Sequence, residues 1–379
     1  MIGPMTGALE AFLADRTRAT PYLVLDLDVV ADRYTRLAAA FPEARLLYAV
    51  KACPEPAVLR LLARLGTGFD VASPAEIDLC LDAGASPGSL CHGNPVRAPG
   101  AVAAAHAAGV RRFVTDSAED LADHLPGTSV LVRILVDDRG SATPFFGKFG
   151  AAPAEAVRLL RAAAARGLDP GLTFHVGSQQ SRPQAYREAV RVALRAAGKA
   201  GLAHPALDVG GGLPVPYRAP VPAPEEFADA VRDGISGARA AGDVDGADLL
   251  LEPGRALVAE AGVLRTTALR VSRRPGVDHR RWVYLDAGRY QGLAETEGEY
   301  IAYPLRVPGR GGASGPVVLA GPTCDGDDVL YRRTPYALPG DLRAGDHVDL
   351  LHAGAYTASY ASVGFNGFPP LPVHVVGTP

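Results

Sequence analysis

The sequence contains few cysteines, and they are not clustered. Four cysteines occur in 379 residues, and no pair has the CxxC or CxH spacing of a metal site. The pattern therefore predicts neither a disulfide framework nor a zinc site, and we expect no metal. Thiols scattered in this way are typical of a reducing compartment, so we expect a cytoplasmic protein.

An excess of one charge and long apolar segments are also missing. Lys and Arg total 38 against 41 Asp and Glu, which gives a formal net charge of -3, and no long run of one sign occurs. A nucleic-acid partner is therefore not expected. No window approaches the roughly 18 apolar residues that cross a bilayer, and the beginning of the sequence does not resemble a signal peptide. We expect no membrane partner.

Three common nucleotide and metal motifs are absent as well. The sequence has no GxGxxG after its first predicted strand, no GxxxxGK[ST] and no HExxH, which leaves a Rossmann, P-loop or zincin protein without support. What is present is a core-forming composition, with 48% hydrophobic and 21% charged residues. A chain of this length predicts two domains, or one barrel with an appendage.

Short runs of apolar or β-branched residues alternate with Ala-, Leu- and Arg-rich stretches of helical period between about residues 45 and 255. This alternation is typical of βα units on a parallel sheet. Eight such units predict a closed (β/α)₈ barrel. The predicted strands are 46–51, 69–72, 90–93, 112–115, 130–136, 172–176, 206–209 and 249–252.

The pattern changes from about residue 260 onward. Helical period gives way to short strand-like runs separated by Gly and Pro turns. We interpret this part as a second, mainly β domain. The predicted boundaries are residues 28–260 for the barrel and residues 1–27 plus 261–379 for the β domain.

Polar residues follow the predicted barrel strands, at the end where barrels carry their active sites. Lys51 follows an apolar strand, where desolvation would lower the pKa of its amine and favour a nucleophile; a salt bridge is the alternative. The glycines at 210–212 could cradle a phosphate or form only a tight turn. The whole set is Lys51, Asp70, Ser73, Asn94, Arg133, His175, Ser178, Gly210, Gly211, Gly212, Glu252 and Arg255.

Three further patterns refine this set. Glu252 and Arg255 could pair with each other, or each could serve one part of a cofactor that has a basic ring nitrogen and a phosphate. His175 suits stacking on a planar ring, unless it is a satisfied core residue. Ser73 and Glu76 have the spacing of a capping box, so we expect Glu76 to cap a helix.

A reactive cluster, GPTCDGDD, occurs at residues 321–328 of the predicted β domain. Its thiol, Cys324, lies beside three carboxylates, and nearby negative charge raises the pKa of a thiol. This arrangement opposes a thiolate. A protonated Cys324 could instead act as an acid.

Together these motifs resemble the fold-type III pyridoxal 5'-phosphate (PLP) decarboxylases with the alanine-racemase-like fold, and within them the bacterial ornithine/lysine decarboxylase group. The resemblance extends from Tyr22 to about Val376. It rests on YAVKACP (48–54), FDVASPAEI (69–77), GKFG (147–150), FHVGSQQ (174–180), DVGGGLP (208–214), EPGR (252–255), GPTCDGDD (321–328), GAYT (354–357) and FNGF (365–368).

The resemblance implies PLP as the cofactor and gives the matching residues roles. Lys51 would hold PLP through its amine, His175 would stack on the ring, and Glu252 would pair with the pyridine nitrogen. Cofactor binding is also implied for Asp70, Arg133, Ser178, Gly211, Gly212, Gly254, Arg255 and Tyr356.

The resemblance further implies a homodimer whose active sites are composite. In a head-to-tail dimer, Cys324 would reach the neighbouring subunit's site as the proton donor. Asp325 would pair there with the distal ammonium of an amino-acid substrate. Asp286 and Tyr290 belong to the segment that adjoins the substrate.

The implied reaction is decarboxylation of ornithine or lysine to the diamine, a step of polyamine biosynthesis. Asp325 favours a diamino monoacid, because diaminopimelate decarboxylases typically have Cys-Glu-Ser at Cys324–Gly326. Ala287 and Arg289 depart from related sequences, so a diaminopimelate- or carboxynorspermidine-type enzyme, or a specialised amino-acid decarboxylase, stays open. Racemisation also uses this fold. A non-catalytic regulatory homologue is an alternative of another class, although its expected losses, at Lys51 or Cys324, have not occurred.

Overall fold

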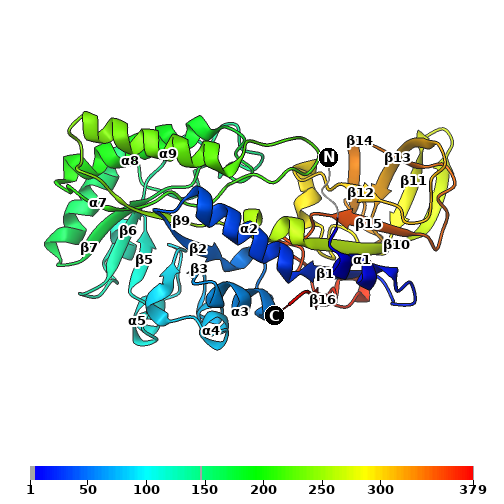
Figure 1. The fold of residues 1–379 in the computed structure, drawn as a ribbon, viewed down its shortest axis with the longest axis horizontal. Coiled ribbons are helices and arrows are strands. Elements are labelled where there is room, and N and C mark those ends of the chain that lie inside the picture. Colours follow the sequence, from blue (N-terminus) through cyan, green and yellow to red (C-terminus); the bar gives the residue numbers. More distant parts are fainter. Residues whose placement is uncertain (1–4, 146, 379) are drawn as a thin grey trace. The chain divides into compact units, whose positions relative to one another are not determined.

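A computed structural model describes residues 5–145 and 147–378, and the chain forms two compact units (Figure 1). The barrel unit comprises Ala31–Pro214 and Val221–Ala256, and the β unit comprises Met1–Val30, Val215–Pro220 and Leu257–Pro379. Residues 1–4 of the predicted β domain lie outside the described residues. In sequence, the barrel unit is therefore inserted between parts of the β unit.

Eight parallel strands of the barrel unit close into a barrel, with the last paired to the first. They are β2 (Arg45–Ala49), β3 (Gly68–Val71), β4 (Leu90–His92), β5 (Arg112–Thr115), β6 (Ser129–Arg133), β7 (Asp169–Thr173), β8 (Ala206–Asp208) and β9 (Asp248–Leu251). Five buried side chains, Leu47, Cys91, Val114, Leu131 and Leu250, form one cluster. They come from alternating strand positions that point into the barrel, so the barrel has a packed interior. The predicted (β/α)₈ barrel is confirmed.

Proline begins most of the longer helices between these strands. A proline at the first helical position loses no hydrogen bond, because that N–H has no partner within the helix. Helices that start in this way are α3 (Pro56–Arg64), α4 (Pro74–Asp82), α7 (Pro153–Ala165), α8 (Pro183–Ala200) and α9 (Pro224–Ala240). The others are α2 (Leu27–Ala40), α5 (Ala101–Ala107), α6 (Ala118–Leu121) and α10 (Arg255–Val258).

The β unit is built on one sheet, which confirms the predicted second, mainly β part. The strands are β1 (Tyr22–Asp26), β10 (Gly262–Arg274), β11 (Asp278–Leu285), β12 (Leu305–Arg306), β13 (Ser314–Ala320), β14 (Val329–Pro339), β15 (His347–Leu351) and β16 (Val373–Val376). Their main order is β12-β15-β10-β11-β13-β14. In addition, β1 pairs antiparallel with β10 and parallel with β16.

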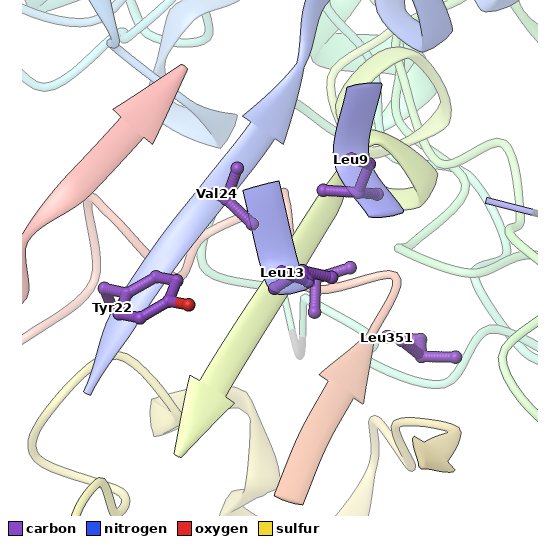
Figure 2. Close-up of a cluster of buried hydrophobic side chains, with 6 residues drawn as sticks. Leu9, Leu13, Tyr22, Val24 and Leu351 are labelled. Atoms are coloured by element: carbon purple, nitrogen blue, oxygen red, sulfur yellow. The ribbon is translucent and has the colours of Figure 1, made fainter. Parts of the chain in front are cut away.

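Helix α1 (Gly7–Ala14) packs on this sheet through its apolar side (Figure 2). Leu9 and Leu13 of the helix form a buried cluster with Tyr22 and Val24 of β1 and with Leu351 of β15. The cluster thus joins residues that precede the barrel in the sequence to a residue that follows it. Burial of such side chains stabilises the β unit by about 1.5–3 kcal/mol each.

A buried ion pair lies in the same unit. Arg265 Nε of β10 donates to Asp349 Oδ1 of β15 over 2.7 Å, and the two side chains are 1% and 0% exposed. Arg265 Nη1 also donates to the carbonyl of Leu13, and Arg306 donates to the second Asp349 oxygen. The pair therefore links two neighbouring strands to the end of helix α1.

The described residues bear on membrane insertion, metal binding and redox chemistry. No described helix is long and apolar enough to cross a bilayer. No group of three or more His, Cys, Asp or Glu side chains in this part of the chain is arranged to hold a metal ion. The four cysteines are free thiols, three of them buried and Cys324 exposed.

Candidate active site

Lys51 lies in a 3₁₀ turn, Val50–Ala52, that follows β2. Its Nζ is 3.1 Å from Asp70 Oδ2 at the end of β3. The Lys51 side chain is 52% exposed, whereas Asp70 is 5% exposed. The expected desolvation of the amine is therefore wrong: β2 ends at Ala49, and the turn carries Lys51 to the open mouth of the barrel. The alternative prediction, a salt bridge, describes the observed contact.

Glu76 lies in the first turn of helix α4, whose N-cap is Ser73, and near the Lys51–Asp70 pair. Ser73 Oγ accepts the Glu76 N–H at 3.3 Å, and Glu76 Oε2 accepts the N–H of Ala72 at 2.6 Å. The predicted capping box is therefore half formed: Ser73 caps the helix, whereas the Glu76 side chain accepts the N–H of Ala72, one residue before the N-cap. Burial raises the pKa of Glu76, and the negative charge of Asp70 adds to the rise while Lys51 opposes it.

His175 follows β7 with its ring held in one tautomer. The Gly177 N–H donates to Nδ1 over 3.0 Å, so the hydrogen of the neutral ring is on Nε2. Burial lowers the pKa of His175 well below its ordinary value, and the positive charges of Arg133 and Lys51 lower it further. Phe145 packs edge-on against the ring with centroids 4.7 Å apart. The result is a neutral, fixed imidazole at the barrel mouth.

The three predicted glycines form a turn that larger residues could not form. Gly210 and Gly212 have φ of 66° and 102°. A Cβ on Gly211 would lie 2.6 Å from the Glu252 carbonyl oxygen, and one on Gly212 would lie 2.3 Å from the Gly177 oxygen. The turn is therefore packed closely against the segments that carry Glu252 and His175. Backbone N–H groups in a glycine turn of this kind can cradle a phosphate.

Glu252 follows β9 and shares its surroundings with an acid that our sequence interpretation missed. Asp208, the last residue of β8, is fully buried, and its carboxyl interacts with that of Glu252. The backbone brings the two acids together, because the Glu252 N–H donates to the carbonyl of Gly210, two residues after Asp208, at 2.9 Å. Burial raises the pKa of both groups, most strongly that of Glu252. The available signal was its position: a polar residue ending a barrel strand, next to the glycines.

Ser178 follows β7 and Arg255 follows β9, the two strands that neighbour β8 and its glycine turn, and the two side chains lie close together. Arg255 is 5% exposed, and its Nη2 is 3.4 Å from Ser178 Oγ. Before it, a Cβ on Gly254 would lie 3.0 Å from the Ala52 Cβ, so the glycine allows close packing on the Lys51 turn. A guanidinium with a hydroxyl suits a phosphate.

Arg133 ends β6 among aromatic rings. Its guanidinium carbon lies 5.0 Å from the Phe145 ring and 4.8 Å from the Phe149 ring. Burial lowers the pKa of Arg133, whereas Glu252, Asp70 and other nearby carboxylates raise it. Arg133 therefore brings a positive charge into the acidic interior of the barrel mouth.

Cys324 belongs to a loop of the β unit whose shape depends on Asp328. The buried Asp328 carboxylate accepts the Thr323 N–H at 3.0 Å and the Arg289 N–H at 2.8 Å. Cys324 itself donates through its N–H and Sγ to Asn366 Oδ1, at 3.2 and 3.5 Å. The Cys324 loop is thus joined to the Arg289 segment and to the FNGF motif.

Asp325 interacts with Tyr290, and burial together with the Asp325 charge raises the pKa of Tyr290. The Tyr290 ring packs on Phe365 at 4.5 Å. Asp286, by contrast, accepts from Thr20 Oγ at 2.5 Å and from the Thr267 N–H at 2.8 Å.

Asp286 thus has both oxygens engaged within the β unit, and burial raises its pKa. Tyr356, the remaining predicted phosphate ligand, also belongs to this unit and adopts φ of 63°. The predicted residues are therefore grouped in two sets. The cofactor set is in the barrel unit, apart from Tyr356, and the substrate set is in the β unit.

The barrel-unit set has the chemistry that PLP requires. An amine at the open mouth suits its aldehyde, and a neutral imidazole suits the face of its ring. The buried Glu252 carboxyl suits the ring nitrogen, and Arg255, Ser178 and the glycine turn suit the phosphate. A buried acceptor, Asp208 Oδ2, has no hydrogen-bond donor among the described residues.

Comparison with known proteins gives concordant matches. Residues 27–259 match the family described as "Pyridoxal-dependent decarboxylase, pyridoxal binding domain". The lysine/ornithine decarboxylase of Selenomonas ruminantium is 36% identical over 360 residues, covering 92% of this chain and 88% of that protein. A diaminopimelate decarboxylase of Actinosynnema pretiosum subsp. auranticum is 36% identical over 369 residues, covering 90% and 81%. The structure of lysine/ornithine decarboxylase from Vibrio vulnificus with cadaverine matches with a TM-score of 0.84 at 31% identity, covering 97% of each chain.

Proposed function

The chain belongs to the pyridoxal-dependent decarboxylase family and is an enzyme that uses PLP, and we propose that it decarboxylates lysine or ornithine to the diamine. The relative from Selenomonas carries both substrates in its name, and the Vibrio structure holds cadaverine, which is lysine without its carboxylate. The observation that carries the proposal is the placement of Asp325 beside Cys324, in contact with Tyr290. A carboxylate there suits a distal ammonium.

The barrel-unit residues divide the work of holding the cofactor. Lys51 binds the aldehyde end, and Asp70 holds the amine in place. Glu252 binds the ring nitrogen, and Arg255 and Ser178 bind the phosphate with the glycine turn. When bound, PLP withdraws electrons from the Cα of the amino acid and so stabilises the charge left by the lost carboxylate.

The same barrel set includes side chains that shape the site without carrying a charge to the substrate. His175 supports the ring face as a neutral imidazole, because burial holds its pKa low. Gly211, Gly212 and Gly254 allow the segments around the cofactor site to pack closely, since a Cβ at each would meet a protein neighbour within about 3 Å. Arg133 balances the nearby carboxylates.

The β-unit residues act on the substrate. Cys324 delivers a proton to the Cα, and Asp325, oriented by Tyr290, pairs with the distal ammonium. Asp286 accepts hydrogen bonds from Thr20 and Thr267 and so holds the start of the segment that carries Tyr290 in place. We propose a homodimer in which these groups complete the partner's site, and a cytoplasmic location, which suits the free thiols.

The test is a comparison of kcat/KM on lysine, ornithine, arginine and meso-diaminopimelate for wild type and Asp325→Asn. Loss of the carboxylate leaves the distal ammonium unpaired, at a cost of about 2–5 kcal/mol for a desolvated pair. We expect kcat/KM for lysine and ornithine to fall by orders of magnitude while PLP binding persists. The matched control is Asp327→Asn, two residues away and exposed, which should change little.

Two results would overturn the proposal. Near wild-type turnover of lysine and ornithine by Asp325→Asn would place the ammonium elsewhere. Preferential turnover of meso-diaminopimelate by the wild type would favour the activity named for the Actinosynnema relative. The variant Asp325→Glu extends the carboxylate by one methylene and should shift preference toward ornithine, the shorter substrate.

A further inference from the structure

The proposed function leaves one buried acid without a role. Asp208 ends β8 inside the barrel and is 0% exposed. Its Oδ1 accepts the Gly210 N–H at 2.8 Å, at the start of the glycine turn. Its Oδ2 is shielded from solvent and has no hydrogen-bond donor among the described residues. The side chain that interacts with this carboxyl is that of Glu252, whose N–H donates to the Gly210 carbonyl at 2.9 Å.

Two carboxyl groups in contact cannot both be ionised at low cost. Neither carboxylate has a hydrogen to donate, so the contact is repulsive unless one proton lies between them. Two such acids titrate as a pair that retains one proton over a wide range of pH. Asp208 ends β8 and is fully buried, and Glu252 follows the neighbouring strand β9, so the backbone holds both side chains in the same part of the barrel.

The surroundings of the pair contain charges of both signs. Asp70 adds negative charge and favours the protonated pair. Lys51 and Arg112 add positive charge and oppose it, but Lys51 is paired with Asp70. The groups that face the pair from the other strands and the Lys51 turn are Lys51, Asp70, Cys91, Arg112 and Arg133.

We propose that Asp208 is a positioning residue that shares one proton with Glu252 and thereby holds the Glu252 carboxyl where the cofactor's ring nitrogen binds. The inference rests on the proposed role of Glu252. The other Asp208 oxygen, Oδ1, fixes the glycine turn by accepting the Gly210 N–H. One buried carboxyl thus aligns the ring-nitrogen end of the site with its phosphate end.

Three variants separate this role from simple anchoring of the turn. In Asp208→Asn, the amide oxygen can still accept the Gly210 N–H, and the amide nitrogen donates to Glu252 without providing a shared proton. Glu252→Gln removes the same proton from the other side. Asp208→Ala removes both the turn contact and the proton. If anchoring is the whole role, only the alanine variant is impaired.

The first measurement is infrared spectroscopy of the full-length, cofactor-free protein at neutral pH. We expect the C=O stretch of a protonated carboxylic acid in the wild type and its loss in Asp208→Asn and in Glu252→Gln. Glu76→Gln is the control, because Glu76 is the other partly buried acid with a raised pKa beside Lys51 and Asp70. A band that survives both pair variants, or that disappears only with Glu76→Gln, would overturn the proposal.

The second measurement is cofactor affinity as a function of pH, followed by the visible absorbance of bound PLP. Asp208→Asn should weaken binding by about 10- to 100-fold and change its pH profile, as expected when a buried charge-assisted contact is altered. Wild-type affinity and profile in Asp208→Asn, with a defect only in Asp208→Ala, would reduce Asp208 to an anchor of the turn. Should Asp208→Ala fail to fold, the Asn and Gln variants decide alone.

These measurements do not involve the amino-acid substrate. Failure of the Asp325→Asn experiment would therefore refute the proposed substrate and leave the shared proton standing. Wild-type PLP affinity in Glu252→Gln would refute the role of Glu252 and, with it, the positioning role of Asp208. The two failures are distinguishable.

Discussion

Asp70 Oδ2 lies 3.1 Å from Lys51 Nζ, and the carboxylate is almost fully buried while half of the lysine side chain is exposed. A buried carboxylate has few other groups with which to pair. Asp70 therefore restricts the motion of the Lys51 amine without covering it. Burial raises the pKa of the neighbouring Glu76, and the negative charge of Asp70 adds to the rise. Lys51 is therefore held in position and remains accessible from the barrel mouth.

The first prediction follows from that accessibility. Borohydride reduction of the PLP-loaded protein should fix a pyridoxyl group on Lys51. Peptide mapping can decide this clearly, because the chain has only two other lysines, Lys148 and Lys199. Lys51→Ala should carry no label. A label on either of the other lysines in the wild type would refute the assignment.

A second prediction concerns the glycine turn. Gly212→Ala adds a Cβ that would lie 2.3 Å from the Gly177 oxygen, in a residue with φ of 102°. Strain of about 1–3 kcal/mol should distort the turn, and we expect PLP affinity, measured by absorbance titration, to fall at least about tenfold. Gly88→Ala has no atom near its new Cβ and is the matched control. Equal affinities for the two variants would show that the turn does not hold the cofactor.

The barrel could be predicted because its evidence is periodic. Each βα unit repeats an apolar run and a helix, and the predicted strand 112–115 coincides with β5. The exposure of Lys51 could not be predicted, since it depends on a 3₁₀ turn stabilised by its packing on Gly254. The segment Val215–Pro220, which groups with the β unit, was likewise invisible because its contacts are distant in sequence.

The candidate site shows the same division. Motif residues such as Glu252 and Arg255 could be selected from their positions at strand ends. Asp208 ends a strand too, but nothing in the sequence indicates that its carboxyl contacts Glu252 across two barrel strands. The sequence also does not indicate that both Asp286 oxygens accept hydrogen bonds, from Thr20 and Thr267. Contacts between distant segments decide these roles.

A third prediction tests the composite dimer. Lys51→Ala and Cys324→Ala proteins should each be inactive as decarboxylases. After subunit exchange, a mixed dimer has one site with both native residues, so activity should recover to about a quarter of the wild-type value, since about half of the dimers are mixed. Decarboxylase assays before and after exchange measure this. Exchange demonstrated by mass spectrometry without recovery would place Cys324 in its own chain's site.

The fourth prediction uses the neutral state of His175. Its pKa is well below the ordinary value of 6.5 in the folded chain, so below about pH 6.5 the unfolded chain binds a proton that the folded chain does not. The free energy of unfolding should therefore fall as pH is lowered, with a slope from this group of up to about 1.4 kcal/mol per pH unit. His175→Gln should lose less stability over the same range.

The measurement is urea unfolding of the cofactor-free protein at about pH 7.5 and pH 5.5, followed by the circular dichroism of the helices. The difference between the two proteins removes the contribution of other titrating groups, including Asp208. Parallel pH dependences would mean that His175 is protonated in the folded chain.

The fifth prediction addresses the buried ion pair of the β unit. Asp349→Asn leaves the charge of Arg265, which is 1% exposed, without its carboxylate, at a cost of about 3–5 kcal/mol. Arg306→Ala removes a 34% exposed partner of the same carboxylate and should cost about 1 kcal/mol or less. Fluorescence of Trp282, the single tryptophan and a buried residue of this unit, reports urea unfolding. Equal midpoints for the two variants would contradict the prediction.

The pairing of β1 with β10 and β16 sets an order of events during protein synthesis. All five residues of β1 are buried in the finished sheet, yet both of its partner strands are translated only after the whole barrel unit. On the ribosome, the barrel can fold before β10 and β16 are synthesised, and β1 remains an unpaired apolar segment during that time. A nascent chain thus keeps an exposed strand edge until late in translation, the kind of segment that chaperones protect.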